Sequence, residues 1–158
     1  MGYDYFHRTQ KGLISLQVFI WSKTGATAVL QMAALDTAAT AVTIPTSIAK
    51  ALGYDFKNAT KMLVSTASDE TKEVPIVTLS GIKAINEELK DVQAAVLDIP
   101  NKREIRVLLG NTFLEHFNFA VYMSDGIIVA NPALKKEEIR IEAGARERSS
   151  QKSKKRKQ

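Results

Sequence analysis

The sequence predicts a mostly β domain with a barrel-like core, and three observations support this fold class. About ten short segments with apolar or alternating patterns follow one another at close spacing, as strands do in small barrels. Only two short segments have helical spacing, and no long helices alternate with the strands as they would in a parallel α/β sheet. The length of 158 residues, 45% of them apolar and 25% charged, suits one packed domain and is short for two.

The individual elements follow from apolar spacing and turn residues. Residues 13–21 alternate apolar and polar side chains, the pattern of a strand with one buried face. Pro45 begins a short helix that stops at Gly53, and Asp125-Gly126 is a hairpin turn signal. In chain order we expect strands at 13–21, 29–35, 41–44, 62–66, 74–79, 82–85, 92–99, 105–109, 119–123 and 127–130, polar turns at 67–73 and 86–88, and a second helix at 112–117.

The two ends of the chain are expected to differ from the domain itself. We expect residues 1–12 to form a flexible N-terminal arm, residues 13–132 the domain, and residues 133–158 a charged helix followed by a disordered basic tail. Ten Lys/Arg and four Asp/Glu lie in residues 135–158, so of the net charge of +5 this end carries +6 and the rest −1. A weak polyanion contact would therefore belong to residues 146–158.

Composition excludes several classes of protein. The absence of cysteine excludes disulfide scaffolds, thiol nucleophiles and cysteine-ligated metals, and it permits a reducing compartment. With two histidines in the chain, we expect no histidine-rich metal site. No apolar run approaches the roughly 18–20 residues of a membrane span, so we expect a cytoplasmic protein. A secretory signal over residues 8–28 is disfavoured because Ser15 and Gln17 interrupt its apolar segment.

Asp36 is the strongest candidate for a functional residue. It lies between the apolar residues 33–35 and a run of alanine and threonine, where a buried carboxylate is costly unless it has partners. The alternative interpretation is an ordinary turn or helix-cap aspartate that accepts backbone N–H groups.

Three pieces of sequence decide between these interpretations. The first is Asp36-Thr37-Ala38-Ala39-Thr40, which leads into Val42-Thr43-Ile44-Pro45. The second is the hairpin over residues 64–79, and the third is Leu108–Leu114, which contains Leu109-Gly110. In this order they resemble the retropepsin-like aspartic proteases, the retroviral and related single-domain peptidases, through the family's Asp-Thr-Gly motif with a strand ending in Ile-Pro, its flap, and its apolar-apolar-Gly element.

The resemblance covers residues 13–130 and implies the closed β-barrel of the acid protease fold, with one or two short helices and a flap. It implies a homodimer in which Asp36 from each subunit activates a water molecule to hydrolyse a peptide or protein substrate, without a metal or an organic cofactor. Thr37, Ala38 and Ala39 would support the catalytic loop. The flap tip, which would cover the substrate, consists of Ala67, Ser68, Asp69 and Glu70.

One departure from the family pattern leaves alternatives open. Ala38 occupies the position of the motif glycine, which allows a close backbone approach that a Cβ can prevent. The first alternative is therefore a catalytically inactive module that binds peptide or forms dimers. The second is a nucleic-acid-associated β-barrel anchored by the basic tail at residues 146–158.

Overall fold

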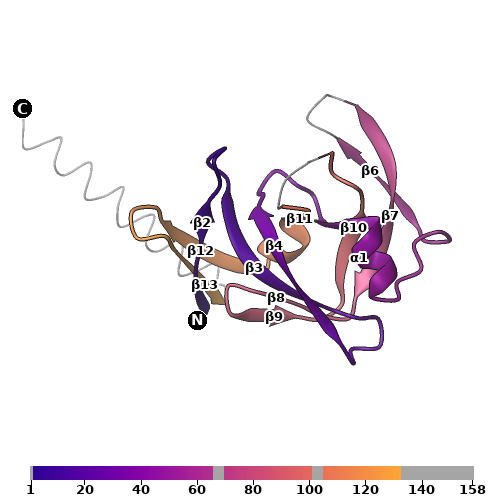
Figure 1. The fold of residues 1–158 in the computed structure, drawn as a ribbon, viewed down its shortest axis with the longest axis horizontal. Helices are drawn as coiled ribbons and strands as arrows, with labels where there is room; N and C mark the ends of the chain where they lie inside the picture. Colours follow the sequence, from indigo (N-terminus) through magenta and orange to yellow (C-terminus); the bar gives the residue numbers. More distant parts are fainter. Residues whose placement is uncertain (1, 66–69, 101–104, 133–158) are drawn as a thin grey trace, which may run out of the picture.

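A computed structural model describes residues 2–65, 70–100 and 105–132, which form thirteen strands and two short helices (Figure 1). The mostly β fold class is therefore confirmed. In chain order the elements are β1 Gly2–Tyr5, β2 His7–Arg8, β3 Ile14–Trp21, β4 Ala28–Leu35, β5 Val42–Ile44, α1 Thr46–Ala51, β6 Lys61–Ser65, β7 Thr71–Leu79, β8 Ile82–Ala84, β9 Glu87–Leu89, β10 Val92–Val96, β11 Val107–Leu109, α2 Asn111–Leu114, β12 Phe117–Tyr122 and β13 Ile127–Pro132.

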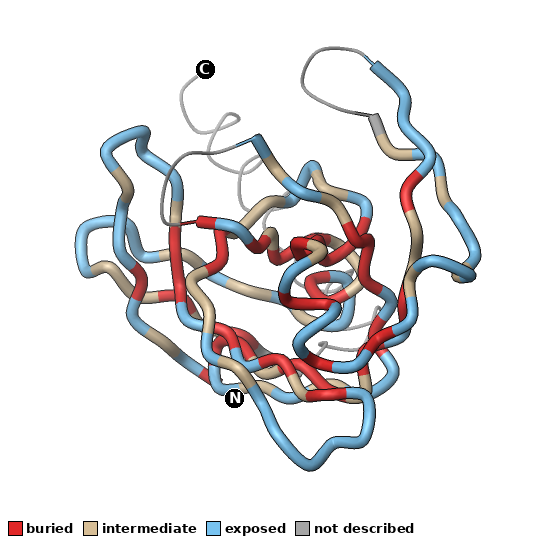
Figure 2. The backbone as a smooth tube through the Cα atoms, turned by 45° about the vertical axis from the view of Figure 1, so that its right-hand side comes forward, coloured by how far each residue is buried: buried red, intermediate tan, exposed pale blue. Residues whose placement is uncertain are grey.

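Two sheets build the domain. The larger has ten strands, in the order β6-β7-β10-β5-β11-β4-β3-β8-β9, with β2 paired to β3. The smaller places β13 between β1 and β12. Among the described residues the pairing path of the larger sheet runs from β6 to β9 without joining these two strands. The barrel-like shape therefore arises because the sheet curls around its buried face (Figure 2).

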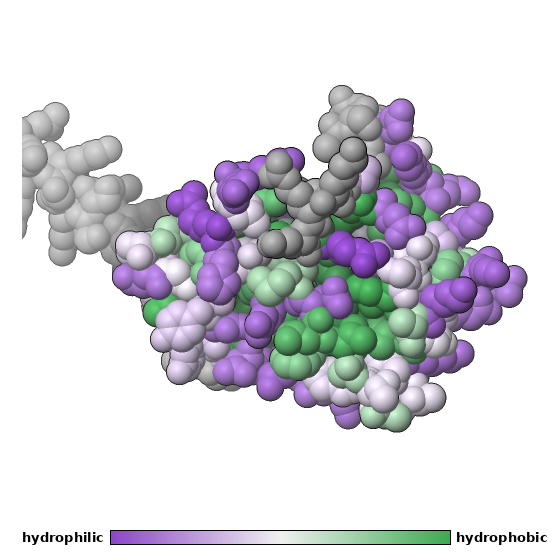
Figure 3. Space-filling view, viewed as in Figure 1, coloured by the Kyte–Doolittle hydropathy of each residue, from purple (hydrophilic) through white to green (hydrophobic). Residues whose placement is uncertain are grey.

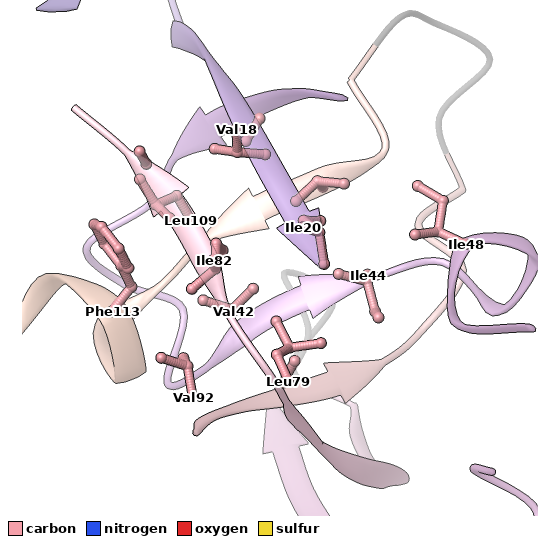
Figure 4. Packing of buried hydrophobic residues seen from close by; sticks show 14 of the residues in the cluster. Val18, Ile20, Val42, Ile44, Ile48, Leu79, Ile82, Val92, Leu109 and Phe113 are labelled. Carbon is pink, nitrogen blue, oxygen red and sulfur yellow. The ribbon is translucent and has the colours of Figure 1, made fainter. Parts of the chain in front are cut away.

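The predicted hairpin at residues 13–21 and 29–35 is confirmed as β3 and β4, which pair antiparallel. Alternation along β3 directs Leu16, Val18 and Ile20 into the core, where all three are fully buried. All three belong to one buried cluster, in which Figure 4 shows Val18 and Ile20 with apolar side chains from β5, β7, β8, β11 and α2. The periodic pattern of β3 thus selects the face on which the core assembles.

Strand β5 is the central element for the candidate loop. Val42, Thr43 and Ile44 are all buried because β5 lies between β10 and β11 in the sheet. It pairs parallel with β10 and antiparallel with β11. The chain that leaves the loop after Asp36 therefore enters the middle of the sheet at once.

The outer face of the β3–β4 hairpin is less polar than its alternation suggests. Phe19 and Leu30 oppose each other across the two strands and are 40% and 47% exposed. The ring of Phe19 also lies 6.5 Å from that of Trp21. On the face of the molecule seen in Figure 3, which has the orientation of Figure 1, apolar side chains also form a patch among polar ones.

The expectation that residues 1–12 form a flexible arm is wrong for residues 2–8. Strand β1 pairs antiparallel with β13, and β2 pairs antiparallel with β3. Between them the Phe6 side chain is only 6% exposed, and its backbone N–H donates to the Gly126 carbonyl at 2.9 Å. Residues 2–8 are therefore part of the described fold, because strand pairing and the burial of Phe6 hold them against later segments of the chain.

A second expectation, the polar turn at residues 86–88, is also corrected. The turn is made by Ile85 and Asn86, which have positive φ angles of 53° and 58°, the conformation that two-residue hairpin turns require. Glu87–Leu89 is instead the strand β9, paired with β8. Residue 85 is fully buried in the core, which offsets the strain of a β-branched residue at positive φ.

Some predictions lie outside the described residues. These are the three flap-tip residues 67–69 and the charged helix and basic tail over residues 133–158. Neither helix of the described residues has the length or the apolar character needed to cross a membrane.

The anchoring of the N-terminal segment can be tested with neighbouring aromatic residues. We expect Phe6→Ala to lower the free energy of unfolding by about 3–5 kcal/mol, because it empties a buried site. Tyr5→Ala is the control, since Tyr5 is 63% exposed, and it should cost about 1 kcal/mol or less. Chemical denaturation measures both. Equal stability of the two variants would contradict the docking of this segment.

Candidate active site

Asp36 lies directly after the end of β4, beside the end of β11. The two strands are parallel neighbours, with Leu35 paired to Leu109, so both deliver the next residue to the same edge of the sheet. The backbone N–H of Asp36 continues this pairing by donating to the Leu109 carbonyl at 3.1 Å. Sheet topology therefore brings together two motifs that are far apart in the sequence.

The carboxylate of Asp36 is oriented by its own loop. Its Oδ1 accepts hydrogen bonds from the backbone N–H groups of Ala38 at 3.0 Å and Ala39 at 3.2 Å. No residue in the described part of the chain donates to Oδ2. Asp36 is half-buried, so one carboxylate oxygen is held by the loop and the residue still reaches the surface.

Asp55 provides a comparison for this geometry within the same chain. Its Oδ1 accepts the backbone N–H of Lys57 at 3.1 Å, the same two-residue step as from Asp36 to Ala38. The Asn58 side chain and the Lys57 N–H lower the pKa of Asp55 by hydrogen bonding to its charged form. A turn aspartate therefore makes such bonds without any special site, and the carboxylate geometry alone does not separate the two interpretations of Asp36.

The support beneath the loop is what distinguishes Asp36. A Cβ on Gly110 would collide with the Ala41 carbonyl and would come within 2.9 Å of the Ala39 carbonyl oxygen. The loop backbone after Asp36 thus rests directly on a residue that has no side chain. Leu109 and Gly110, chosen from the sequence as a structural element, do lie against the candidate loop.

Two polar residues after Gly110 were not predicted as part of the site. Asn111 donates its backbone N–H to the Ala39 carbonyl at 2.9 Å and its side-chain Nδ2 to the Thr37 carbonyl at 3.0 Å. Thr112 Oγ1 accepts the Val42 N–H at 2.9 Å and donates to the Gln93 carbonyl at 2.7 Å. Their position immediately after the apolar-apolar-Gly element was the available signal.

The replacement of the motif glycine by Ala38 meets no obstacle within the chain. Among the described residues, the non-glycine residues with positive φ are Ile85, Asn86 and Asp91, so Ala38 does not need a conformation that favours glycine. Ala38 and Thr37 are both exposed. The extra methyl group therefore faces away from the protein's own core.

The structure brings the loop residues 36–39 together with Leu109 and Gly110. The predicted flap corresponds to the β6–β7 hairpin, which projects from the body of the domain (Figure 1). Of the four predicted tip residues, Glu70 is the one that the structure describes, and its Oε2 lies 3.8 Å from Lys72 Nζ. In the described ranges no three His, Cys, Asp or Glu residues cluster in a way that could hold a metal ion.

This arrangement, a curved β domain with an Asp-Thr loop on an apolar-apolar-Gly element, defines a retropepsin-like fold. A solved retropepsin-like aspartic protease from Rickettsia conorii is similar in structure, with a TM-score of 0.61 at 19% identity over 82% of this chain and 90% of that chain. Residues 24–116 match the family described as "gag-polyprotein putative aspartyl protease", and the chain belongs to this family. No curated protein sequence matches the chain.

The close approach at Gly110 can be tested with two glycine substitutions. We expect Gly110→Ala to lower the free energy of unfolding by about 1–3 kcal/mol, because the loop must move to admit the methyl group. Gly81→Ala is the control: its Cβ would lie 3.5 Å from the Trp21 ring, an ordinary contact, and the change should stay within about 1 kcal/mol. If urea unfolding finds the variants equally stable, the loop does not rest on Gly110.

Proposed function

We propose that the protein is an aspartic endopeptidase that hydrolyses peptide bonds with a water molecule activated by two Asp36 carboxylates in a homodimer. The observation that carries this proposal is the placement of Asp36 on a loop supported by Gly110, in a chain of the aspartyl protease family. Neither the turn geometry nor the fold would suffice alone, since Asp55 makes a similar turn.

The chemistry requires two carboxylates a few ångströms apart. Two such groups do not both ionise readily, so the pair shares one proton. The ionised member takes a proton from water, and the protonated member donates to the carbonyl oxygen of the scissile bond. This is the established chemistry of aspartic proteases as a class. Activity therefore depends on a singly protonated pair and declines both at low pH, where both are protonated, and at high pH, where both are ionised.

A homodimer supplies the second carboxylate. The sequence contains the Asp-Thr motif once, at Asp36-Thr37, so an identical partner related by a two-fold axis is the simplest source of a matching group. Thr37 and Ala38 are exposed in the single chain, which leaves the loop accessible to a partner. We assign to Thr37 the role of joining the two loops through its hydroxyl group.

The substrate is a peptide or protein segment in extended conformation. The β6–β7 hairpin would cover it, with Ala67–Glu70 at the tip, and would exclude water from the reaction. No cofactor takes part in this mechanism. We place the protein in the cytoplasm, since a chain without cysteine suits a reducing compartment.

A second candidate function rests on Ala38. If two methyl groups at the dimer axis obstruct the catalytic water, the same fold would bind peptides or form dimers without cleaving. A polyanion contact through residues 146–158 is compatible with either function and would add to it rather than replace it.

The catalytic role of Asp36 is tested by digesting a peptide library at several pH values. We expect cleavage greatest at acidic pH and reduced at least about 100-fold in Asp36→Asn, because an amide cannot act as general base. Asp55→Asn is the matched control, since Asp55 makes a similar turn away from the Gly110 support, and it should cleave like the parent. Sedimentation checks that each variant still dimerises. A dimer that cleaves nothing at any pH would favour the inactive module.

The effect of Ala38 is tested by restoring the motif glycine. We expect Ala38→Gly to change kcat by less than about three-fold, since Ala38 is exposed and needs no glycine conformation, and to lower stability by roughly 0.5–1 kcal/mol. Kinetics and thermal unfolding measure the two effects. A parent without activity and an active Ala38→Gly variant would show that the methyl group blocks the site.

A further inference from the structure

Asn111 contacts the Asp36 loop at two points. It is the first residue of α2, immediately after Gly110, and it is half-buried. Its backbone N–H donates to the Ala39 carbonyl at 2.9 Å, and its side-chain Nδ2 donates to the Thr37 carbonyl at 3.0 Å. The two accepting carbonyls flank Ala38, so Asn111 holds the loop on both sides of the residue that departs from the family motif.

The side-chain contact acts on the same peptide group that binds the carboxylate. The Thr37 carbonyl and the Ala38 N–H belong to one planar peptide unit. Its oxygen accepts from Asn111 Nδ2, and its N–H donates to Asp36 Oδ1 at 3.0 Å. In such a chain of hydrogen bonds, a donor at the carbonyl oxygen polarises the peptide and strengthens the N–H at its other end.

We infer that Asn111 is a positioning residue for Asp36: the side-chain amide of Asn111 fixes the Thr37–Ala38 peptide, so that the Ala38 N–H orients the Asp36 carboxylate. The inference deepens the proposed protease function and rests on it as far as catalysis is concerned. Asn111 touches neither water nor substrate in this role. It acts through the loop.

Thr112 offers a structural comparison beside Asn111. Its hydroxyl joins the Val42 N–H to the Gln93 carbonyl, and among the described residues it makes no hydrogen bond to the Asp36 carboxylate.

The test compares Asn111→Leu with Asn111→Gln in the full chain. Leucine has nearly the same size, lacks the donor and keeps the backbone N–H to Ala39, whereas glutamine keeps an amide donor. We expect Asn111→Leu to lower kcat about ten-fold with KM within about two-fold, since one hydrogen bond near a charge is worth roughly that factor. Asn111→Gln recovers part of the lost kcat, because its amide can still donate to the Thr37 carbonyl.

Two further variants separate positioning from stability. Asn111→Ala removes the donor without adding apolar bulk and should reproduce the kinetic change if the leucine variant folds poorly. Thr112→Val should lower thermal stability and leave the Ala38 amide resonance in the NMR spectrum unchanged. An unchanged kcat in both Asn111→Leu and Asn111→Ala would overturn the inference, and so would a loss confined to thermal stability.

A readout independent of activity separates this inference from the proposed function. In protein labelled with 15N, the Ala38 amide resonance is followed by NMR at one pH. We expect the Ala38 amide proton to move upfield in Asn111→Leu relative to the parent, because a peptide that has lost the donor at its carbonyl oxygen makes a weaker N–H bond to Asp36. The Lys57 amide, which donates to Asp55, should stay unchanged. A parent that fails to cleave peptides would refute the protease, yet a shifted Ala38 amide would still support the inference. An unchanged Ala38 amide would overturn it whatever the activity.

Discussion

The contact between the loop after Asp36 and the backbone of Gly110 is the constraint on which the site depends. Parallel pairing of β4 with β11 ends both strands at one edge, and the missing side chain at Gly110 lets the carbonyls of Ala39 and Ala41 come down onto it. Above this contact, the backbone N–H of Ala38 in the loop donates to the Asp36 carboxylate. The chain then enters β5 at the centre of the sheet.

This constraint also explains how the loop accommodates a change in its motif. The peptide groups around Ala38 are held by Asp36 on one side and by Asn111 on the other, so their orientation does not depend on a glycine conformation. Ala38 is exposed in the single chain. Any consequence of its methyl group for catalysis would therefore arise in the proposed dimer rather than in the single chain.

The first and last strands of the described chain, β1 and β13, pack together beside the larger sheet that carries the site. Strand β1 pairs with β13, and a Cβ at Gly2 would collide with the Ile85 backbone carbonyl, so the N-terminal strand runs close to the β8–β9 hairpin. The small sheet is thus connected to the large one through backbone packing as well as through the core. Helix α2 leads from the loop support directly into β12, which links this sheet to the site.

The sequence by itself determined the features that depend on local periodicity and local chemistry. Alternation of apolar and polar residues predicted the β3–β4 hairpin, and Pro45 predicted the start of α1. Asp36 was a candidate because a carboxylate beside apolar residues is costly to bury without partners. Only the tertiary structure decided what partners these elements have. Three features could not be predicted from a local pattern: the pairing of β1 with β13, the turn at the β-branched Ile85, and the hydrogen bond from Asn111 to Thr37, 74 positions away. They arise from packing between segments that are distant in the sequence, and periodicity reports only on neighbouring residues.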